Sequence, residues 1–582
     1  MPVTFAQETP SVPFETLAAV ADRVRGTTKK LEKMALLAEY FTTLGDNDLA
    51  IAARYIAGQV FPQHDMRVLQ VGGAAVVQAL IALSGRTREE IAPLSVRLGE
   101  LGEVARTILP GHLLETPTLT LAIVETAVEQ LARTTGSKAK TTLLTELLRV
   151  ATPLEATYLV KLVSSDLRIG LKQGLVEDAL ARGFGRPLPT VSHAAMLLGD
   201  LGEVAVLARA GTLDRAELRL FHPLGAMLAT PAASPEEALA NLPEGWALVE
   251  DKFDGVRAQI HRDGDRLAIY SRTLDEVTHR FPELHAPLLA LPGPFVLDAE
   301  IIGEREGRAL PFNLFQQRLG RKAVTDDVLR DIPVVLVAFD LLYHNGDLLF
   351  AHPLIERRAL LASLLGETNI SLEDVLEAEG FLPNSPPSPR GKGAGGLGLP
   401  LRLSQGHRVT GPTEIDTLFA AARERGNEGL MVKLPHSAYT PGRRGAEWRK
   451  VKRALATLDV VVTAVEWGHG RRHKLLSDYT FAVRASETDP TLLNVGKAYS
   501  GLTDVELADL TQWFLAHTRE DFGRVRTVEP EIILEVTFDA VQESKRHKSG
   551  YALRFPRILR LRDDKPLDEI DTLAGVRALA VQ

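Results

Sequence analysis

The spacing of apolar and polar residues is helical over the first third of the chain. From Phe14 to about Arg209, apolar residues recur three and four positions apart, as in the stretch 31–41, and this spacing is typical of amphipathic helices. The pattern predicts an all-helical domain over residues 1–215. By itself, such a domain is also consistent with a bundle that has a purely structural role.

Two sites in this segment carry helix start signals. Thr87 follows the break at Ser84-Gly85-Arg86 and is a candidate N-cap, because the acidic pair Glu89-Glu90 suits the first turn of a helix. Asp46-Asn47-Asp48 precedes the apolar run that begins at Leu49, and we expect it to cap the next helix.

After residues 224–229 the pattern changes to short β-type runs broken by turns. Residues 259–262 and 267–270 flank Asp263-Gly264-Asp265, which predicts a β-hairpin. The other strand candidates in this region are residues 295–302 and residues 334–343, the second of which ends near Asn345-Gly346.

A third region begins near Leu458 and is again rich in strands, with candidates at residues 459–465 and 531–536; a small β-barrel is the simplest architecture for it. Between these regions, the Pro- and Gly-rich stretch 383–400 cannot pack a core and is expected to be a surface insertion. The predicted fold is multidomain α+β. Its boundaries are residues 1–215 for an all-α domain, 216–456 for an α+β domain and 457–582 for a β-barrel.

Composition agrees with several folded domains. A chain of 582 residues with 45% hydrophobic and 24% charged residues is too long for one ordinary core. It has no cysteine, which excludes disulfides, thiolate zinc sites and cysteine nucleophiles. It has no long uncharged apolar run and no basic segment followed by an apolar one at its start. The sequence therefore predicts a cytoplasmic protein without membrane contact.

Charge is uneven along the chain. The formal net charge of -8 argues against coating nucleic acid by bulk charge. Basic residues nevertheless cluster in the C-terminal half, where they are compatible either with a solvated face or with a groove that contacts phosphates. These clusters are Arg443, Arg444, Arg449, Lys450, Lys452 and Arg453; Arg471, Arg472 and Lys474; and several residues from Lys545 to Arg562.

Lys252 is the candidate nucleophile. It stands in Glu250-Asp251-Lys252-Phe253-Asp254-Gly255, where Asp254-Gly255 is a turn signal. A lysine ammonium cannot attack, so the residue needs a pocket in which cations such as Arg257 and a metal ion on the ligand favour the neutral amine. The hexapeptide alone also fits a charged strand end with a tight turn.

Six further motifs follow Lys252 along the chain. Each is weak by itself, because a single glutamate at a strand is usually a surface or paired carboxylate and a single phenylalanine is usually core. They are Ser271-Arg272-Thr273-Leu274, Leu297-Asp298-Ala299-Glu300, Ala338-Phe339-Asp340, Glu428-Gly429-Leu430-Met431-Val432-Lys433, Trp448-Arg449-Lys450-Val451-Lys452 and Arg554-Phe555-Pro556-Arg557.

Together and in this order, the motifs resemble those of the ATP-dependent DNA ligases of the lysine nucleotidyltransferase superfamily. The stretch Ser164-Ser165-Asp166-Leu167-Arg168-Ile169-Gly170-Leu171 extends the likeness to the archaeal and eukaryotic replicative type. The resemblance implies a helical DNA-binding domain, an adenylation domain and an OB-fold. The insertion at 383–400 departs from the compact family pattern.

The resemblance also implies a role for each motif residue. Lys252 would carry AMP as a phosphoramidate, Glu250 would recognise the adenine edge, and Phe339 would stack on the base. Glu300 and Glu428 would contact ribose and bind Mg²⁺. The cations implied to hold ribose, the phosphates or pyrophosphate are Arg257, Arg272, Lys433, Arg444, Lys450, Lys452, Arg554 and Arg557.

The implied reaction seals nicks in duplex DNA, with ATP and Mg²⁺ as cofactors. The resemblance also implies that the protein contacts mostly the DNA backbone. It implies a monomeric enzyme, with a sliding clamp as a candidate partner. An RNA ligase or a capping guanylyltransferase uses a similar lysine and stays an alternative, as does a catalytically inactive DNA-binding scaffold. The NAD-dependent ligases share the Lys-x-Asp-Gly core, but their cysteine zinc module cannot exist in a chain without cysteine.

Overall fold

The structure is a computed structural model that describes residues 11–305, 307–310, 312–319, 321, 324–366, 400–451, 456–468, 472 and 474–580. The predicted insertion therefore lies outside the described residues, apart from Pro400. The chain divides into two compact units, one of residues 1–83 and 109–452 and the other of residues 84–108 and 453–582.

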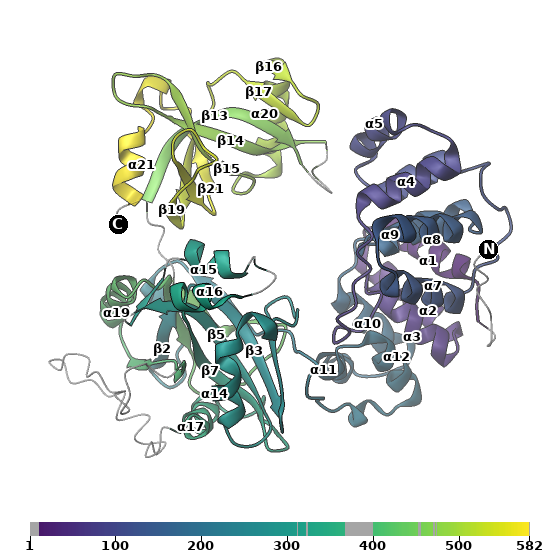
Figure 1. Ribbon diagram of the computed structural model, residues 1–582, viewed down its shortest axis with the longest axis horizontal. Coiled ribbons are helices and arrows are strands. Elements are labelled where there is room, and N and C mark those ends of the chain that lie inside the picture. Colours follow the sequence, from purple (N-terminus) through teal and green to yellow (C-terminus); the bar gives the residue numbers. More distant parts are fainter. Residues whose placement is uncertain are drawn as a thin grey trace. The chain divides into compact units, whose positions relative to one another are not determined.

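The N-terminal segment is helical, as predicted (Figure 1). Thr87 caps its helix as expected: its side chain accepts from the backbone N–H of Glu90, and the Glu90 side chain accepts from the backbone of Thr87. The helices are α1 (Phe14–Arg25), α2 (Lys30–Thr43), α3 (Asp46–Ile56), α4 (Gly73–Ser84), α5 (Arg88–Leu98), α6 (Leu101–Ile108), α7 (Leu121–Arg133), α8 (Ser137–Arg149), α9 (Pro153–Val163), α10 (Gln173–Gly183), α11 (Leu188–Leu198) and α12 (Leu201–Ala210).

The cap expected from Asp46-Asn47-Asp48 is wrong. Helix α3 already begins at Asp46, its N-cap is Gly45, and no side chain caps it. The carboxylate of Asp48 instead accepts from the Ser11 hydroxyl at 2.5 Å and from the Val12 backbone N–H at 2.9 Å. The acidic residue thus anchors a distant segment of chain, which local spacing does not reveal.

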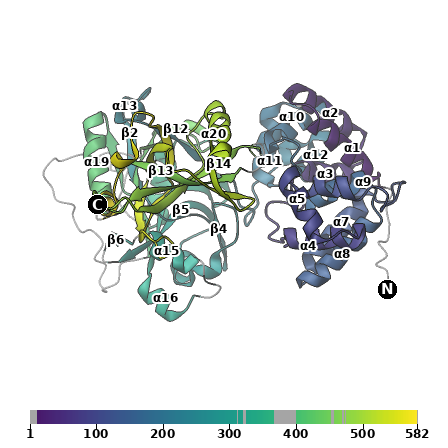
Figure 2. The ribbon, with the colours of Figure 1, turned by 90° about the horizontal axis from the view of Figure 1, so that it is seen from above.

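One five-stranded sheet, the β2 sheet, has the order β1-β12-β11-β2-β10. Val249, Val432 and Phe419 belong to the apolar cluster between one face of this sheet and helix α19, which lies beside β2 in both ribbon views (Figures 1 and 2). Its elements are β1 (Leu228–Ala232), β2 (Ala247–Lys252), β10 (Gly406–Val409), β11 (Gly429–Lys433), β12 (Arg444–Val451), α13 (Pro235–Ala238) and α19 (Pro412–Glu424).

A second sheet, the β5 sheet, has the order β4-β3-β5-β7-β8, with β6 paired to β5 and β9 to β7. One face packs through residues such as Leu297 and Leu336 against Leu288 and Leu361 of the covering helices. The elements are β3 (Val256–Asp263), β4 (Arg266–Ser271), β5 (Phe295–Arg305), β6 (Arg308–Ala309), β7 (Val334–His344), β8 (Asp347–Leu348), β9 (Leu401–Leu403), α14 (His285–Ala290), α15 (Phe312–Leu319), α16 (Asp326–Asp331) and α17 (Leu354–Leu364).

Both turns that the sequence signals are present in this sheet. Strands β3 and β4 pair antiparallel around Gly264 and Asp265, and Gly264 has φ +55°, as the first position of a type II′ hairpin turn requires. Strand β7 pairs with β8 around Asn345 and Gly346, which both have positive φ. The predicted hairpin is therefore confirmed.

The C-terminal region forms the β-rich domain that the sequence predicts. Strand β13 pairs with β18 along its first half and with β17 along its second half, so the sheet turns at β13 around one apolar core. Its elements are β13 (Ala456–Trp467), β14 (Leu476–Arg484), β15 (Leu492–Ala498), β16 (Thr518–Asp521), β17 (Val525–Val528), β18 (Ile533–Phe538), β19 (Ala540–Glu543), β20 (Tyr551–Arg554), β21 (Arg557–Leu561), α20 (Asp504–Ala516) and α21 (Leu573–Ala580). Within the described part of the chain, every helix is too short or too polar to span a membrane.

Candidate active site between the β2 and β5 sheets

Strand alternation places Glu250 and Lys252 on the face of the β2 sheet that is turned away from α19. Neighbouring side chains on a strand point to opposite faces, and Val249 lies in the α19 core. The ladder sets Gly429 opposite Lys252 and Met431 opposite both Glu250 and Lys450. The two predicted lysines, 252 and 450, therefore share one face with Glu250.

Lys252 contacts a carboxylate directly. Its Nζ lies 2.5 Å from Oε2 of Glu428, and the Glu428 backbone N–H donates to the carbonyl oxygen of Lys252 at 2.8 Å. Both side chains are about one-fifth exposed. The predicted nucleophile and one predicted metal ligand thus meet at the C-terminal end of strand β2, and both stay partly exposed.

The β5 sheet turns its own polar face toward this site. Arg257 on β3 is paired across the ladder with Glu300 on β5. The Arg257 guanidinium binds both oxygens of Asp298, at 2.9 and 2.6 Å, and donates to the carbonyl oxygen of Met227 at 2.6 Å. Burial lowers the pKa of Arg257, but the carboxylate of Asp298 outweighs that effect, and the pKa is raised above its ordinary value.

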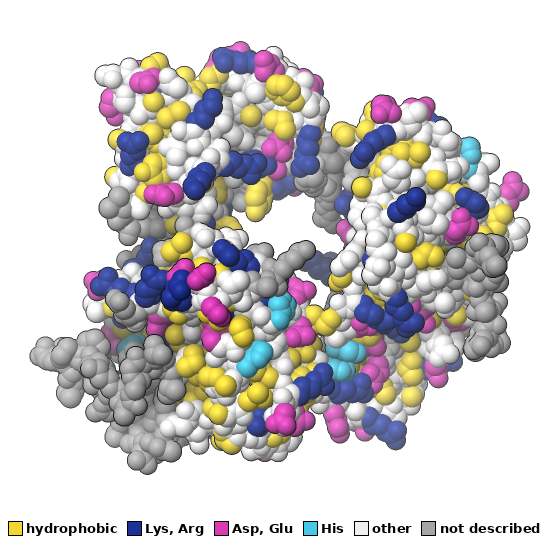
Figure 3. Space-filling model, viewed as in Figure 1, with side chains coloured by type: hydrophobic (Ala, Val, Ile, Leu, Met, Phe, Trp, Pro, Cys, Tyr) yellow, Lys and Arg dark blue, Asp and Glu magenta, His cyan; other side chains and the backbone are white. Residues whose placement is uncertain are grey.

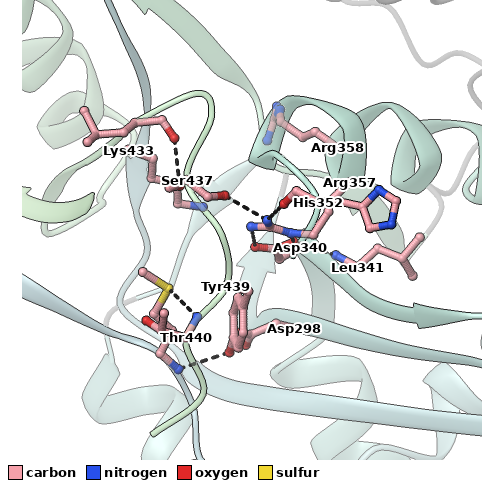
Figure 4. A network of polar contacts seen from close by, with 12 residues as sticks. Asp298, Asp340, Leu341, His352, Arg357, Arg358, Lys433, Ser437, Tyr439 and Thr440 are labelled. Atoms are coloured by element: carbon pink, nitrogen blue, oxygen red, sulfur yellow. Dashed lines mark hydrogen bonds and ion pairs between the residues drawn. The ribbon is translucent and has the colours of Figure 1, made fainter. Parts of the chain in front are cut away.

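Asp298 is itself held by a buried tyrosine. The Tyr439 hydroxyl donates to Oδ2 of Asp298 at 2.6 Å and accepts from the Met227 backbone N–H at 3.1 Å (Figure 4). Burial raises the pKa of Tyr439 well above its ordinary value, and the neighbouring Asp298 carboxylate adds to this effect. The tyrosine is thus a neutral donor that fixes Asp298, and through it Arg257.

Glu300 has a strongly shifted pKa. Burial raises the pKa of this carboxyl from 4.5 to about 8, although the positive charges of Lys252 and Arg257 oppose the shift. Asp298 and Glu428 are near enough to add to the rise. The carboxyl of Glu300 therefore shares one electrostatic environment with the predicted nucleophile, Lys252, and with Glu428.

Phe339 occupies a β-bulge. Strands β5 and β7 pair Asp298 with Asp340 and Ala299 with Ala338, so Phe339 has no partner in the ladder. Its half-buried ring lies 6.2 Å from the Trp448 ring, edge to face, and 4.7 Å from Nζ of Lys433. The bulge thus brings an aromatic face beside the cations of the β2 sheet.

A buried ion pair secures the strand that carries this bulge (Figure 4). Arg357 on α17 binds both oxygens of Asp340, at 2.7 and 2.9 Å, and donates to the carbonyl oxygens of His352 and Ser437. Both Arg357 and Asp340 are fully buried. The next arginine, Arg358, pairs with Glu250, whose second oxygen lies 2.5 Å from Nζ of Lys433.

Not every predicted residue joins this cluster. Arg272 directly follows β4 and is exposed, and Arg444 is exposed at the start of β12, where it donates to the carbonyl oxygen of Ala229. Arg554 and Arg557 belong to the other compact unit, where Arg557 lies 3.7 Å from Asp539. Lys452 lies outside the described residues.

Four residues of the site received no role from the sequence: Asp298, Trp448, Arg358 and Tyr439. Asp298 stands two positions before Glu300, and Trp448 stands two positions before Lys450. Strand alternation could therefore have placed each of them on the same face of its sheet as the predicted residue. Arg358 sits in an apolar helix, where an unexplained arginine was the only signal. For Tyr439, local sequence offers no signal, because its partners are 141 and 212 residues away.

The chain has a helical region, a region with two sheets and a curved β-rich region, and it places a lysine beside carboxylates and an aromatic ring. These features are typical of nucleotidyltransferases that act through a covalent intermediate. The chain belongs to the family of ATP-dependent DNA ligases. Family models match it for the DNA ligase N terminus at residues 13–181, the ATP dependent DNA ligase domain at 226–380 and 400–452, and the ATP dependent DNA ligase C terminal region at 472–565. The resemblance found in the sequence is confirmed.

Curated relatives agree with this assignment. The chain is 48% identical to a probable DNA ligase of Koribacter versatilis, over 96% of the chain and 95% of that protein. It is 35% identical to a DNA ligase of Archaeoglobus fulgidus, over 97% and 98% of the two chains. A solved structure described as Pmar-Lig_Pre covers 94% of this chain and 99% of its own with a TM-score of 0.59; at 15% identity it supports the fold alone.

Proposed function

We propose that this chain seals nicks in duplex DNA by joining a 3′-hydroxyl to a 5′-phosphate through a lysyl-AMP and a DNA-adenylate. The observation that carries the proposal is the contact of Lys252 with Glu428 beside Glu300, between two sheets that also present Phe339. A merely structural lysine has no need of a partly exposed position beside two carboxyl groups and an arginine.

In the first step, Nζ of Lys252 attacks the α-phosphorus of ATP. A nitrogen–phosphorus bond forms, the bond from phosphorus to the pyrophosphate oxygen breaks, and the lysine loses a proton. The Glu428 carboxylate, 2.5 Å from Nζ, is within hydrogen-bond distance to accept that proton. AMP then moves to the 5′-phosphate of the nick, and the 3′-hydroxyl displaces AMP.

The remaining motif residues bind and orient the nucleotide. Glu250 and Phe339 are proposed to contact the edge and the face of the adenine ring. Arg257 and Arg272 are proposed to hold ribose or phosphate. The exposed Arg272 would do so through its guanidinium fork, whereas the fork of Arg257 binds Asp298, so Arg257 would act mainly through its charge. Charge on the transferring phosphate would be offset by Lys433, Arg444, Lys450 and Lys452.

Glu300 and Glu428 fit Mg²⁺. Their carboxylates are hard oxygen ligands, and Mg²⁺ is commonly held by one or two carboxylates together with water and substrate phosphates. No group of three or more His, Cys, Asp or Glu side chains with metal-binding geometry occurs among the residues that the structure describes. When bound, the ion would offset phosphate charge.

We assign the helical domain to residues 1–215, the adenylation domain to 216–456 and the OB-fold to 457–582. Arg554 and Arg557 would orient pyrophosphate in the first step only, which requires the OB-fold to close and reopen. Nicked DNA would be gripped mainly through its backbone. A sliding clamp as partner, a monomeric state and a cytoplasmic location stay predictions from the sequence.

The test is incubation with α-labelled ATP or labelled NAD, together with nicked duplex DNA or nicked duplex RNA. The proposal expects self-labelling from ATP and sealing of the DNA nick, with NAD inactive. Sealing of RNA in preference to DNA would favour the RNA ligase alternative. Binding of nicked DNA without any labelling would favour the inactive scaffold.

A further inference from the structure

Helix α17 carries two consecutive arginines, Arg357 and Arg358, that are both buried. Arginine is rarely buried unless it is paired, because removing its charge from water costs several kcal/mol. The helix could cover the β5 sheet with apolar residues alone, as Leu361 and Leu364 do. The two arginines therefore point to a task beyond packing.

Arg357 acts on the strand behind the proposed base-stacking ring. Its guanidinium binds both oxygens of Asp340, which directly follows Phe339 on β7. It also donates to the carbonyl oxygen of Ser437 at 2.9 Å. The position of the bulge that presents Phe339 is thereby tied to α17.

Arg358 acts on the proposed base-edge residue. One of its terminal nitrogens binds Oε1 of Glu250, and the other donates to the carbonyl oxygen of Ser404 at 2.5 Å. The Ser404 backbone N–H in turn donates to the carbonyl oxygen of Ala338, next to Phe339. Lys433 holds the second oxygen of Glu250 and also lies over the Phe339 ring. One helix thus fixes the edge residue and the stacking residue of the same pocket.

We propose that Arg358 is a positioning residue that sets the nucleobase specificity of the site. The inference rests on the proposed role of Glu250 and Phe339. Arg358 donates to one oxygen of Glu250 and Lys433 forms an ion pair with the other, and the carboxylate offers only acceptor lone pairs toward the base. It can accept from the 6-amino group of adenine, whereas a 6-oxo group would bring a second acceptor against it. The pocket therefore selects 6-aminopurines over 6-oxopurines.

The test compares self-labelling by α-labelled ATP and α-labelled inosine triphosphate, which has a 6-oxo group, in the full chain and in Arg358→Lys and Arg358→Met. Lysine keeps the charge but cannot donate to Glu250 and Ser404 with the same fork. Arg425→Met is the matched control, because Arg425 pairs with Asp251, next to Glu250, but on the α19 side of β2. Melting curves verify that each variant folds.

We expect both Arg358 variants to raise KM for ATP and to lower the ratio of kcat/KM for ATP over inosine triphosphate by roughly tenfold or more. Arg425→Met should change that ratio by less than about twofold. A wild-type protein that labels itself, and folded Arg358 variants with an unchanged ratio, would overturn the inference and leave the proposed function intact. Absence of self-labelling in the wild type would overturn the proposed function itself.

Discussion

At the scale of single residues, burial and neighbouring charge decide how each group behaves. Asp298 lies beside an arginine and a tyrosine that both donate to it. Glu300, two positions along the same strand face, has a pKa raised to about 8 by burial. Two carboxyl groups on one strand thus differ: the first is fixed by Arg257 and Tyr439, and burial favours the protonated form of the second.

Glu300 predicts a pH dependence of stability. The folded chain holds its proton between about pH 4.5 and pH 8, where the unfolded chain has released it, so this contribution is lost as pH rises through that window. In EDTA, the melting temperature of the wild type should therefore fall relative to Glu300→Gln between about pH 4.5 and pH 8 and level off at higher pH. The difference in the free energy of unfolding between the wild type and Glu300→Gln should change by at most about 1.4 kcal/mol per pH unit. Added Mg²⁺ should reverse the trend, and parallel pH profiles in EDTA would contradict it.

Sequence could predict the residues of the site that stand in dense local motifs. Glu300, Phe339, Glu428 and Lys433 are identified by the resemblance of their motifs to a family. Strand alternation alone would not place Phe339, which occupies a bulge. Arg358 and Tyr439 could not be predicted, since their roles depend on partners more than 100 residues away. A buried salt bridge across that separation is set by the packing of sheets and helices, not by local spacing.

At the scale of elements, close backbone approach explains a motif glycine. A Cβ on Gly255 would lie 2.3 Å from the carbonyl oxygen of Ile301 and 3.0 Å from Cγ of Glu300. Strands β3 and β5 can therefore pair behind Lys252 only if residue 255 has no side chain. The turn that the sequence indicated at Asp254-Gly255 is thus also a contact point with the strand of Glu300.

Gly255→Ala should destabilise the chain by about 1–3 kcal/mol through overpacking and should also slow self-adenylation, because the clash displaces Glu300. Gly264→Ala is the control. Gly264 has φ +55° and open space around it, so alanine there costs about 1–2 kcal/mol of backbone strain without touching the site. Urea unfolding and single-turnover labelling would measure both effects. Equal labelling rates in the two variants would refute the role assigned to Gly255.

The pair of Asp340 and Arg357 predicts non-additive stability effects. Asp340→Leu or Arg357→Met leaves one buried charge without its partner, so each single change should cost about 3–5 kcal/mol. The double variant should recover much of that loss, because it leaves no uncompensated charge from the pair. A double-mutant cycle by urea unfolding tests this, and additive losses would show that the two side chains act independently.

Elements were more predictable than their ends. The β3–β4 hairpin and strands β5 and β7 follow directly from alternation and turn residues. The expected cap at Asp46-Asn47-Asp48 is wrong because the carboxylate of Asp48 binds Ser11 and Val12 instead. A helix start signal is local, and a tertiary hydrogen bond can recruit the same carboxylate.

At the scale of the whole molecule, charge is dispersed. On the surfaces shown in Figure 3, Lys and Arg side chains lie among Asp and Glu side chains. With a formal net charge of -8, DNA binding must depend on local contacts to phosphates. Such contacts release counterions, so affinity should depend strongly on salt and little on sequence.

Removal of residues 1–215 should separate chemistry from DNA capture. The segment that follows has its own contacts with the β5 sheet: the Phe221 N–H donates to His261 at 3.0 Å, and the Leu224 N–H donates to Gln259 at 2.7 Å. The fragment 216–582 should therefore label itself with ATP but bind and seal nicks poorly. Full-length binding should weaken at least about tenfold between about 50 and 200 mM salt. Undiminished sealing by the fragment would assign the helical region to partner docking.

The central claim is that Lys252 forms the covalent bond to AMP. The most direct measurement is peptide mapping by mass spectrometry after incubation with ATP and Mg²⁺, in the wild type, Lys252→Ala and Lys252→Arg. We predict an acid-labile AMP adduct on the peptide that contains Lys252, and none in either variant, because alanine has no amine and arginine keeps its proton. An adduct on another peptide, or labelling that persists in a folded Lys252→Ala protein, would contradict the account.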